Sequence, residues 1–285
     1  MNKNSRDIDI VFLGLAQNCE KHLPKFFEVI NELSKKKNIK VFIGENGSDD
    51  YTFDVIQKNI SLNDRISFID TTFIEKFSDR IKRLALARQK LKNDLVDENL
   101  NPKYVCVVDL DDVLNKNFNI ELIDSLESIL NENENKYFGV SLNSEPYYYD
   151  ILNFESDEFP NEGVKQLQNN RSIKSYSGRK KFIYNVQKSL TKKKKFDCIS
   201  GFNGLCLYFY NDFVKSDYLE KNDDPSPEHL YLNRKLNSIT GKKILVTDNM
   251  LQMPVEHKPL DNIFFFIIEK LVKYIAIYFK RFGFR

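Results

Sequence analysis

The chain has 285 residues, of which 41% are hydrophobic, and its 43 lysines and arginines nearly balance its 41 aspartates and glutamates. This length and composition are typical of a globular protein with one large α/β core or two modest domains. The net charge is too small to argue for nucleic acid as a partner, so only local charge asymmetry is informative.

The four cysteines have no metal-ligand spacing, and three of them, Cys106, Cys198 and Cys206, lie in apolar runs typical of buried strands. A reducing, cytoplasmic location is therefore expected. The start of the chain, MNKNSRDIDIVFLGLAQN, lacks the long apolar region and the cleavage site of a signal peptide. No stretch reaches about 18 uninterrupted apolar residues, so a transmembrane helix is not expected.

The first hundred residues alternate strand and helix patterns with short connections. Strands are predicted at 8–16, 39–45, 65–70 and 104–110, and helices at 23–37, 51–60 and 78–98. This alternation predicts right-handed βαβ units on a largely parallel sheet. The strand at 104–110 is apolar on both faces, which favours a central position.

The half of the chain after residue 136 is less regular. Strands are predicted at 137–142, 204–210 and 242–248, and a helix at 227–237. The charged stretch 150–195 has few apolar anchors and is expected to contain a mobile loop. Its first part is acidic and 171–195 is basic, which suits a loop that meets an anionic acceptor or, alternatively, a solvated lysine-rich loop.

The last 25 residues, 261–285, differ from the rest. Basic side chains recur near helical spacing, while Phe, Ile and Leu fill the remaining circumference. This pattern predicts an amphipathic helix that lies on an anionic membrane surface. The alternative is a helix that docks on the domain or on a second subunit.

The sequence YVCVVDLDDVLN places three carboxylates directly after the apolar strand at 104–110. Ligands of open α/β sheets bind at the carboxyl ends of the strands. Asp109 and Asp111, spaced i and i+2, can point to the same side and share a divalent cation. Alternatively, Asp109 is a nucleophile and Asp111 its acid/base partner, because DLDDV also fits the signature of haloacid dehalogenase-type phosphatases. The phosphatase alternative is weaker, because that acidic strand usually opens its domain, whereas about a hundred residues precede it here.

The order of several motifs resembles nucleotide-sugar glycosyltransferases of the GT-A fold. FIGENGSDDYT is similar to the segment that holds the base and ribose of the donor, and DRIKRLALARQKL is similar to the arginine-rich helix before the DxD strand. The resemblance implies an α/β, Rossmann-like, mostly parallel sheet flanked by helices. It also implies a donor site and a Mn²⁺ or Mg²⁺ site made by Glu45, Asp49, Arg80, Arg88, Asp109 and Asp111.

Two later segments, SLNSEPYYYDILNF and CISGFNGLCLYFY, resemble the acceptor-side strands of capsule-type glycosyltransferases, including the fungal capsule-associated mannosyltransferase-like group. Aromatic faces stack on sugars, and a carboxylate accepts hydrogen bonds from sugar hydroxyls. For each tyrosine the alternative is an aromatic edge that closes the core. The resemblance implies acceptor contacts at Tyr148, Tyr149, Asp150, Ser200, Phe202 and Gly204.

The sequence PEHLYLNRKLNSITGKKILVTDNM is similar to the helix that carries the catalytic acid in these transferases. The resemblance makes Glu228 the candidate base for the acceptor hydroxyl. His229 is its neighbour or an alternative, since the common form of the motif has an acid at this second position. His257 matches a position where many members place a histidine ligand to the metal.

Together these motifs predict a metal-dependent glycosyltransferase that uses a nucleoside-diphosphate sugar, with a UDP-sugar favoured and a GDP-sugar possible. The expected acceptor is a hydroxyl of a glycan or lipid-linked glycan in surface polysaccharide synthesis. We expect one domain over 1–260, with a nucleotide-binding half at 1–115 and an acceptor-binding half at 116–260. The expected location is the cytoplasmic face of a membrane. The alternatives are the phosphatase and an inactive glycan-binding module.

Overall fold

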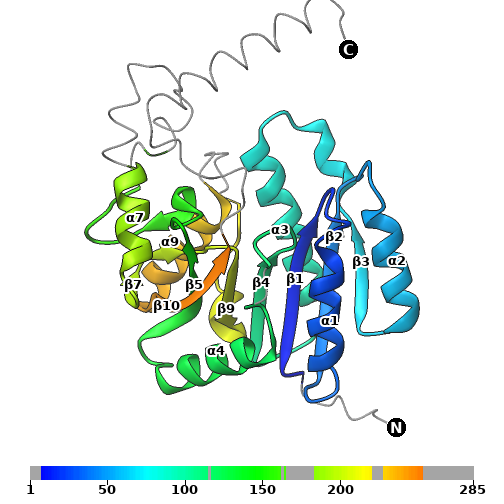
Figure 1. The fold of residues 1–285 in the computed structure, drawn as a ribbon, viewed down its shortest axis with the longest axis horizontal. Coiled ribbons are helices and arrows are strands. Elements are labelled where there is room, and N and C mark those ends of the chain that lie inside the picture. The colour runs from blue at the N-terminus through cyan, green and yellow to red at the C-terminus, as the bar shows by residue number, and fades with distance from the viewer. Residues whose placement is uncertain (1–7, 115–116, 162–163, 165–182, 220–226, 253–285) are drawn as a thin grey trace, which may run out of the picture.

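A computed structural model describes residues 8–114, 117–161, 164, 183–219 and 227–252 (Figure 1). Its strands are β1 (Ile10–Ala16), β2 (Ile39–Glu45), β3 (Ile66–Asp70), β4 (Tyr104–Asp109), β5 (Tyr137–Glu145), β6 (Phe154–Glu155), β7 (Phe196–Cys198), β8 (Ser200–Gly201), β9 (Leu205–Phe209) and β10 (Lys243–Gln252). Its helices are α1 (Leu23–Leu33), α2 (Thr52–Leu62), α3 (Arg80–Asp97), α4 (Ile120–Glu132), α7 (Asn185–Lys192), α8 (Tyr210–Phe213) and α9 (Glu228–Thr240), with short 3-10 helices η1 (Thr72–Lys76) and η2 (Ile151–Asn153).

The main sheet has eight strands in the order β3-β2-β1-β4-β9-β5-β10-β7. Strands β1 to β4 run parallel, as do β5 and β10. This arrangement confirms the predicted α/β class with a central, mostly parallel sheet. The antiparallel β9 lies between β4 and β5, so the two halves of the sheet are joined through one reversed strand.

Helices cover both faces of the sheet, because alternate residues of the buried strands point to opposite sides. Ile10 and Phe12 of β1 pack in a core with α1, α2 and α4. Val11 and Leu13 of the same strand pack in a second core with α3, α7, α8 and α9. Strand β4 is almost fully buried from Tyr104 to Val108, which confirms its predicted central position.

Several elements were not predicted from sequence patterns. Helix α4 was not predicted, although Leu122, Ile123, Leu126 and Leu130 form a buried stripe at helical spacing. The two-stranded sheet of β6 and β8 was also not predicted. The tail 261–285 and residues 162–163 and 165–182 of the charged stretch 150–195 lie outside the described residues. No helix in the described part of the chain is long and apolar enough to cross a membrane.

The close packing of β1 against the end of β4 helps to position the carboxylates that follow β4. Gly14 of β1 lies beside Val108 of β4. A Cβ atom at Gly14 would lie 2.6 Å from Cδ1 and 2.8 Å from Cγ of Leu110, whose side chain is buried. Since Leu110 stands between Asp109 and Asp111, the absence of a side chain at Gly14 helps to set the position of both carboxylates.

We expect Gly14→Ala to lower the free energy of unfolding by about 1–3 kcal/mol, because the added methyl group overpacks Leu110. Urea denaturation of the variant and the wild type measures this difference. An unchanged midpoint would show that Leu110 moves aside without cost and does not fix the acidic cluster.

Candidate functional site

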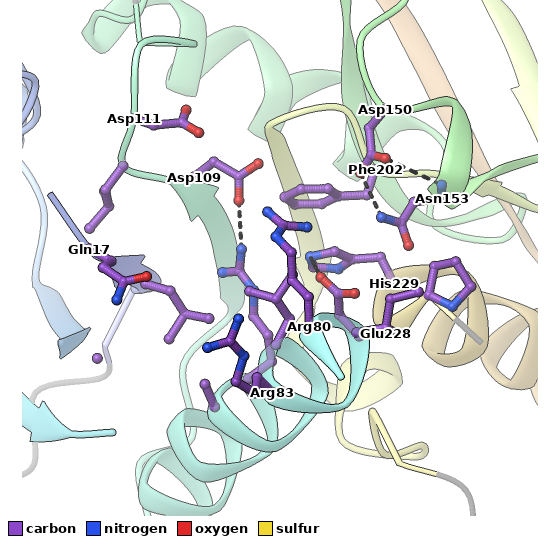
Figure 2. A pocket seen from close by; sticks show the side chains of 18 of the residues that line it. Gln17, Arg80, Arg83, Asp109, Asp111, Asp150, Asn153, Phe202, Glu228 and His229 are labelled. Atoms are coloured by element: carbon purple, nitrogen blue, oxygen red, sulfur yellow. Dashed lines mark hydrogen bonds and ion pairs between the residues drawn. The ribbon is translucent and has the colours of Figure 1, made fainter. Parts of the chain in front are cut away.

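A pocket of about 310 Å³ opens where β1, β2 and β4 end, between the first turns of α3 and α9 (Figure 2). The strands end there because polar residues follow each apolar run, and the carboxyl ends of parallel strands share one edge of the sheet. The pocket also receives side chains from η2 and from the segment before β9. Residues from both halves of the chain therefore meet in it.

Helix α3 presents a basic face to the pocket. Arg80, Arg83, Leu84, Ala87 and Arg88 recur at spacings of three and four residues, so they lie along one side of the helix and line the pocket. Asp79 begins the helix, because its carboxylate accepts a hydrogen bond of 2.9 Å from the backbone N–H of Lys82. The first turn of α3 thus points toward the acidic cluster.

Arg88 forms an ion pair with Asp109 at the end of β4, with 2.6 Å between Nη2 and Oδ1. The Arg88 side chain is only 4% exposed, and its guanidinium lies over the ring of Phe202. Its Nε and Nη1 atoms are buried and have no hydrogen-bond partner within the described residues. Arg88 therefore keeps donors available for a ligand or water inside the pocket.

Asp109 and Asp111 both line the pocket, on either side of buried Leu110. Burial raises the pKa of Asp109, and the charge of Arg88 opposes that increase. The backbone N–H of Val113 donates to Asp111 at 3.3 Å. In Figure 2 the Asp109 carboxylate faces the arginines of α3, and Asp111 lies on its far side.

The residues at this edge fit a Mg²⁺ or Mn²⁺ ion that is shared with a ligand. Such ions are commonly held by one or two carboxylates together with substrate phosphates. Asp109 and Asp111 supply hard oxygen ligands of this kind. Within the described residues there is no group of three His, Cys, Asp or Glu side chains that could hold a metal alone. His257, the third predicted ligand, lies outside those residues.

Glu228 is the first residue of α9 and lines the pocket opposite β4. Negative charge is favourable at this end of a helix because of the helix dipole. Burial raises the pKa of the Glu228 carboxyl, while the charge of Arg88 opposes that increase. A carboxylate with a raised pKa is a stronger base than an ordinary glutamate.

His229 lines the pocket, but its ring is packed between aromatic side chains. Its ring lies flat on Phe202 with 3.6 Å between centroids, and Tyr218 contacts it edge-on. Both ring nitrogens are buried and unpaired among the described residues, and Nε2 lies 3.9 Å from the Glu228 carboxylate. Burial and then the Arg88 charge hold the pKa of His229 well below its usual value, so the ring is neutral. The geometry favours Glu228 over His229 as the acid/base group.

Asp150 lies across the pocket from Asp109, at the start of η2 (Figure 2). Its carboxylate accepts a hydrogen bond of 2.6 Å from Nδ2 of Asn153. Burial raises the pKa of Asp150 to about 8; the negative charges of Glu228 and Asp109 also raise it, and the Asn153 hydrogen bonds oppose the increase. Asp150 is therefore mostly protonated at neutral pH.

Two predicted donor residues do not line the pocket. Glu45 is buried at the end of β2, and its carboxylate accepts a hydrogen bond of 2.6 Å from the backbone N–H of Ser48. It closes the turn after β2. Asp49 lies further along the same turn, where its backbone N–H bonds to Asn18. The contacts of Glu45 and Asp49 with a nucleotide stay predictions.

Of the six predicted acceptor residues, Tyr149, Asp150 and Phe202 line the pocket. Tyr148 is completely buried and packs against Phe154 in the core. This corrects its prediction, because Tyr148 and Tyr149 are neighbours that point in different directions.

Ser200 and Gly204 support the pocket instead of lining it. The Ser200 hydroxyl donates to the carbonyl of Asn153 at 2.5 Å. Gly204 has a φ of +85°, which favours glycine, and its carbonyl accepts from the backbone N–H of Asp109 at 2.9 Å. Their predicted contact with an acceptor is corrected in the same way.

Sequence reasoning missed five polar residues of the pocket: Gln17, Asn46, Thr71, Arg83 and Asn153. Arg83 was detectable, because it follows Arg80 by three residues on the same helix face. Gln17 directly follows β1, so its place at the carboxyl edge was also detectable. The Gln17 amide donates to the Asn46 carbonyl at 3.1 Å, and Asn46 Oδ1 is buried without a partner among the described residues.

No protein-family model and no curated protein sequence matches this chain. A solved structure with the same fold is glucosyl-3-phosphoglycerate synthase from Mycobacterium tuberculosis, in complex with Mn²⁺, UDP and glucosyl-3-phosphoglycerate. The TM-score is 0.50 at 12% identity, over 89% of this chain and 74% of the synthase. This likeness establishes the GT-A fold, a Rossmann-like sheet flanked by helices.

Two further structures are similar at lower scores. Residues 1–349 of S. aureus TarS give a TM-score of 0.46 at 10% identity, over 86% of this chain. The mannosyltransferase PcManGT from Pyrobaculum calidifontis, in complex with GDP-Man and Mn²⁺, gives 0.47 at 10% identity, over 88% of this chain. This chain spans 60% of the TarS fragment and 58% of PcManGT.

The protonated Asp150 predicts a pH-dependent stability that Asp150→Asn removes. The unfolded chain loses the Asp150 proton near 3.8, whereas the folded protein holds it up to about 8. Wild-type stability should therefore fall, relative to Asp150→Asn, as pH rises through this window, because the folded state binds the extra proton. Urea denaturation of both proteins at several pH values measures the difference. A difference that does not vary with pH would show that Asp150 ionises normally.

Proposed function

We propose that the protein is a metal-dependent glycosyltransferase that moves a sugar from a nucleoside diphosphate to an acceptor hydroxyl. The observation that carries this proposal is one pocket that combines the arginines of α3, the Asp109–Asp111 pair and, opposite them, Glu228. Cations and a metal suit a diphosphate, and a carboxylate of raised pKa suits a hydroxyl. The GT-A fold places these groups at the sheet edge where ligands bind.

In this proposal Arg80 and Arg83 bind the diphosphate, because a guanidinium matches phosphate oxygens with paired hydrogen bonds. Asp109 and Asp111 would hold Mn²⁺ or Mg²⁺, which neutralises charge as the nucleoside diphosphate leaves. Arg88 keeps Asp109 in place and balances its charge before any ligand binds.

Glu228 accepts the proton of the acceptor hydroxyl if the reaction inverts the anomeric carbon. If the reaction retains configuration, the same carboxylate stabilises the positive charge that develops on the sugar. Tyr149 offers an aromatic ring to the sugars, and protonated Asp150 can donate a hydrogen bond to a sugar oxygen.

A UDP-sugar is the proposed donor because it is the commonest donor type in this fold, and a GDP-sugar is the second choice. The proposed acceptor is a hydroxyl of a glycan or lipid-linked glycan in surface polysaccharide synthesis. The capsule-type class rests on the sequence resemblance of SLNSEPYYYDILNF and CISGFNGLCLYFY. The proposed location is the cytoplasmic side of a membrane, with the tail 261–285 on its surface.

A thermal-shift panel of UDP, GDP, CMP and dTDP, each with Mn²⁺ or EDTA, tests the donor site. One nucleotide should stabilise the wild type only with metal, by about 2.7 kcal/mol at a hundredfold excess over its dissociation constant. Asp111→Ala should abolish this effect, because a metal ligand is lost.

The matched control is Asp112→Ala, which removes the adjacent carboxylate that does not line the pocket. It should respond to the nucleotide as the wild type does. If no nucleotide shifts the wild type, the transferase proposal fails. Release of phosphate from a generic phosphomonoester would then favour the phosphatase, and sugar binding without turnover would favour the glycan-binding module.

The membrane proposal has a separate test. Deletion of residues 261–285 should abolish co-sedimentation with liposomes that contain anionic lipid, because the basic and apolar side chains of the tail are lost. Liposomes of neutral lipid are the control for charge. Unchanged co-sedimentation of the truncated protein would refute the proposal.

A further inference from the structure

Asn153 links the two sides of the pocket that carry Asp150 and Glu228. It is the last residue of η2, lines the pocket and is 6% exposed. Its side chain hydrogen-bonds in two directions, toward Asp150 on its own turn and toward the first turn of α9. Asn153 lies within the segment SLNSEPYYYDILNF, but the sequence did not single it out.

The amide nitrogen of Asn153 fixes the Asp150 carboxylate. Nδ2 donates to Oδ2 of Asp150 at 2.6 Å, and the backbone N–H of Asn153 lies 3.4 Å from Oδ1. The backbone N–H of Asp150 in turn donates to Oδ1 of Asn203 at 2.9 Å. The Asp150 side chain is therefore oriented from within its own turn, and its backbone is held by the segment before β9.

The amide oxygen of Asn153 caps the helix that carries Glu228. Helix α9 follows Pro227, which has no side-chain acceptor for the free N–H groups of the first turn. Oδ1 of Asn153 accepts from the backbone N–H of Leu230 at 2.9 Å, although the two residues are 77 positions apart. A cap supplied by a distant turn ties the start of α9, and with it Glu228, to η2.

Only a side chain with both a donor and an acceptor can make these two bonds. The backbone of Asn153 is also anchored, since its carbonyl accepts from the Ser200 hydroxyl at 2.5 Å. Ser200 itself accepts from Nδ2 of Asn233, which lies further along α9, at 3.1 Å. The connection between η2 and α9 is thus made twice through buried polar groups.

We propose that Asn153 is a positioning residue that sets the placement of Asp150 relative to Glu228 across the pocket. The inference rests on the proposed sugar transfer, in which Glu228 meets the acceptor hydroxyl and Asp150 meets a sugar oxygen. Because Asn153 acts through these two groups, its loss lowers the rate of the bound complex more than it weakens donor binding.

The chain offers a matched control in Asn161. This residue is also 6% exposed, and its Nδ2 donates to the carbonyls of Ile151, Leu152 and Phe154, around the same turn. It does not line the pocket. Asn161→Ala therefore removes buried hydrogen bonds around the same turn while the bonds of the Asn153 side chain to Asp150 and to α9 are kept.

The first arm of the experiment is kinetic and uses the full chain with a nucleotide sugar, Mn²⁺ and an acceptor. Asn153→Ala and Asn153→Asp should lower kcat by about 10- to 100-fold, the cost of misplaced reacting groups, with little change in the donor KM. Asn161→Ala should keep the wild-type kcat at temperatures where it is folded. Equal losses in Asn153→Ala and Asn161→Ala, or a wild-type kcat in both Asn153 variants, would overturn the proposal.

The second arm measures stability and needs no turnover. Asn153→Asp keeps the acceptor for Leu230 but removes the amide donor to Asp150, so the two carboxyls form a hydrogen bond only while one of them is protonated, and the variant is compared at a pH above 8, where Asp150 is mostly ionised. The double variant Asp150→Asn/Asn153→Asp restores a donor and an acceptor in reversed order, so it should recover most of the denaturation midpoint lost in Asn153→Asp. No recovery would overturn the coupling of the two side chains.

The two arms separate the failure of this inference from the failure of the proposed function. If the wild type turns over no nucleotide sugar and binds no nucleotide with metal, sugar transfer and the role of Asn153 in it both fail. If the wild type is active and the Asn153 variants match Asn161→Ala, only the present inference fails.

Discussion

The ion pair between Arg88 and Asp109 is the interaction around which the pocket is organised. It joins the middle of α3 to the last residue of β4, and it is nearly buried on the arginine side. A buried pair contributes little net stability, but removing one partner leaves an uncompensated charge that costs about 3–5 kcal/mol. The pair therefore fixes the position of α3 relative to the sheet. It thereby also places Arg80 and Arg83, which lie on the same helix.

The same arginine limits how far burial raises the pKa of the carboxyls beside it. The carboxyls of Asp109, Asp150 and Glu228 all have a raised pKa, with burial as the first cause. The Arg88 charge opposes the increase at Asp109 and at Glu228. At Asp150 hydrogen bonds from Asn153 oppose the increase, and the pKa of Asp150 reaches about 8. Asp109 is thus paired with Arg88, Glu228 is a carboxyl of raised pKa that suits a base, and Asp150 is mostly protonated. Such differences in environment are the usual basis for separate chemical roles.

The irregular half of the chain completes a site that is built on the edge of the regular sheet. Strands β1, β2 and β4 end in order along one edge, and their positions follow from parallel pairing. Phe202, Asp150 and Glu228 come from three separate later segments. Polar bonds between buried side chains, such as Asn153 to Leu230, hold these segments together where regular backbone pairing is absent.

The sequence by itself determined the βαβ order, the central place of β4 and the presence of Asp109, Arg88 and Glu228 at the pocket, because apolar periodicity and short motifs are local signals. It could not assign Tyr148 to the core and Tyr149 to the pocket, since neighbours in an irregular turn follow no period. Nor could it find Asn153, whose partner is 77 residues away. Tertiary structure decided these roles, because burial and long-range hydrogen bonds depend on which segments meet.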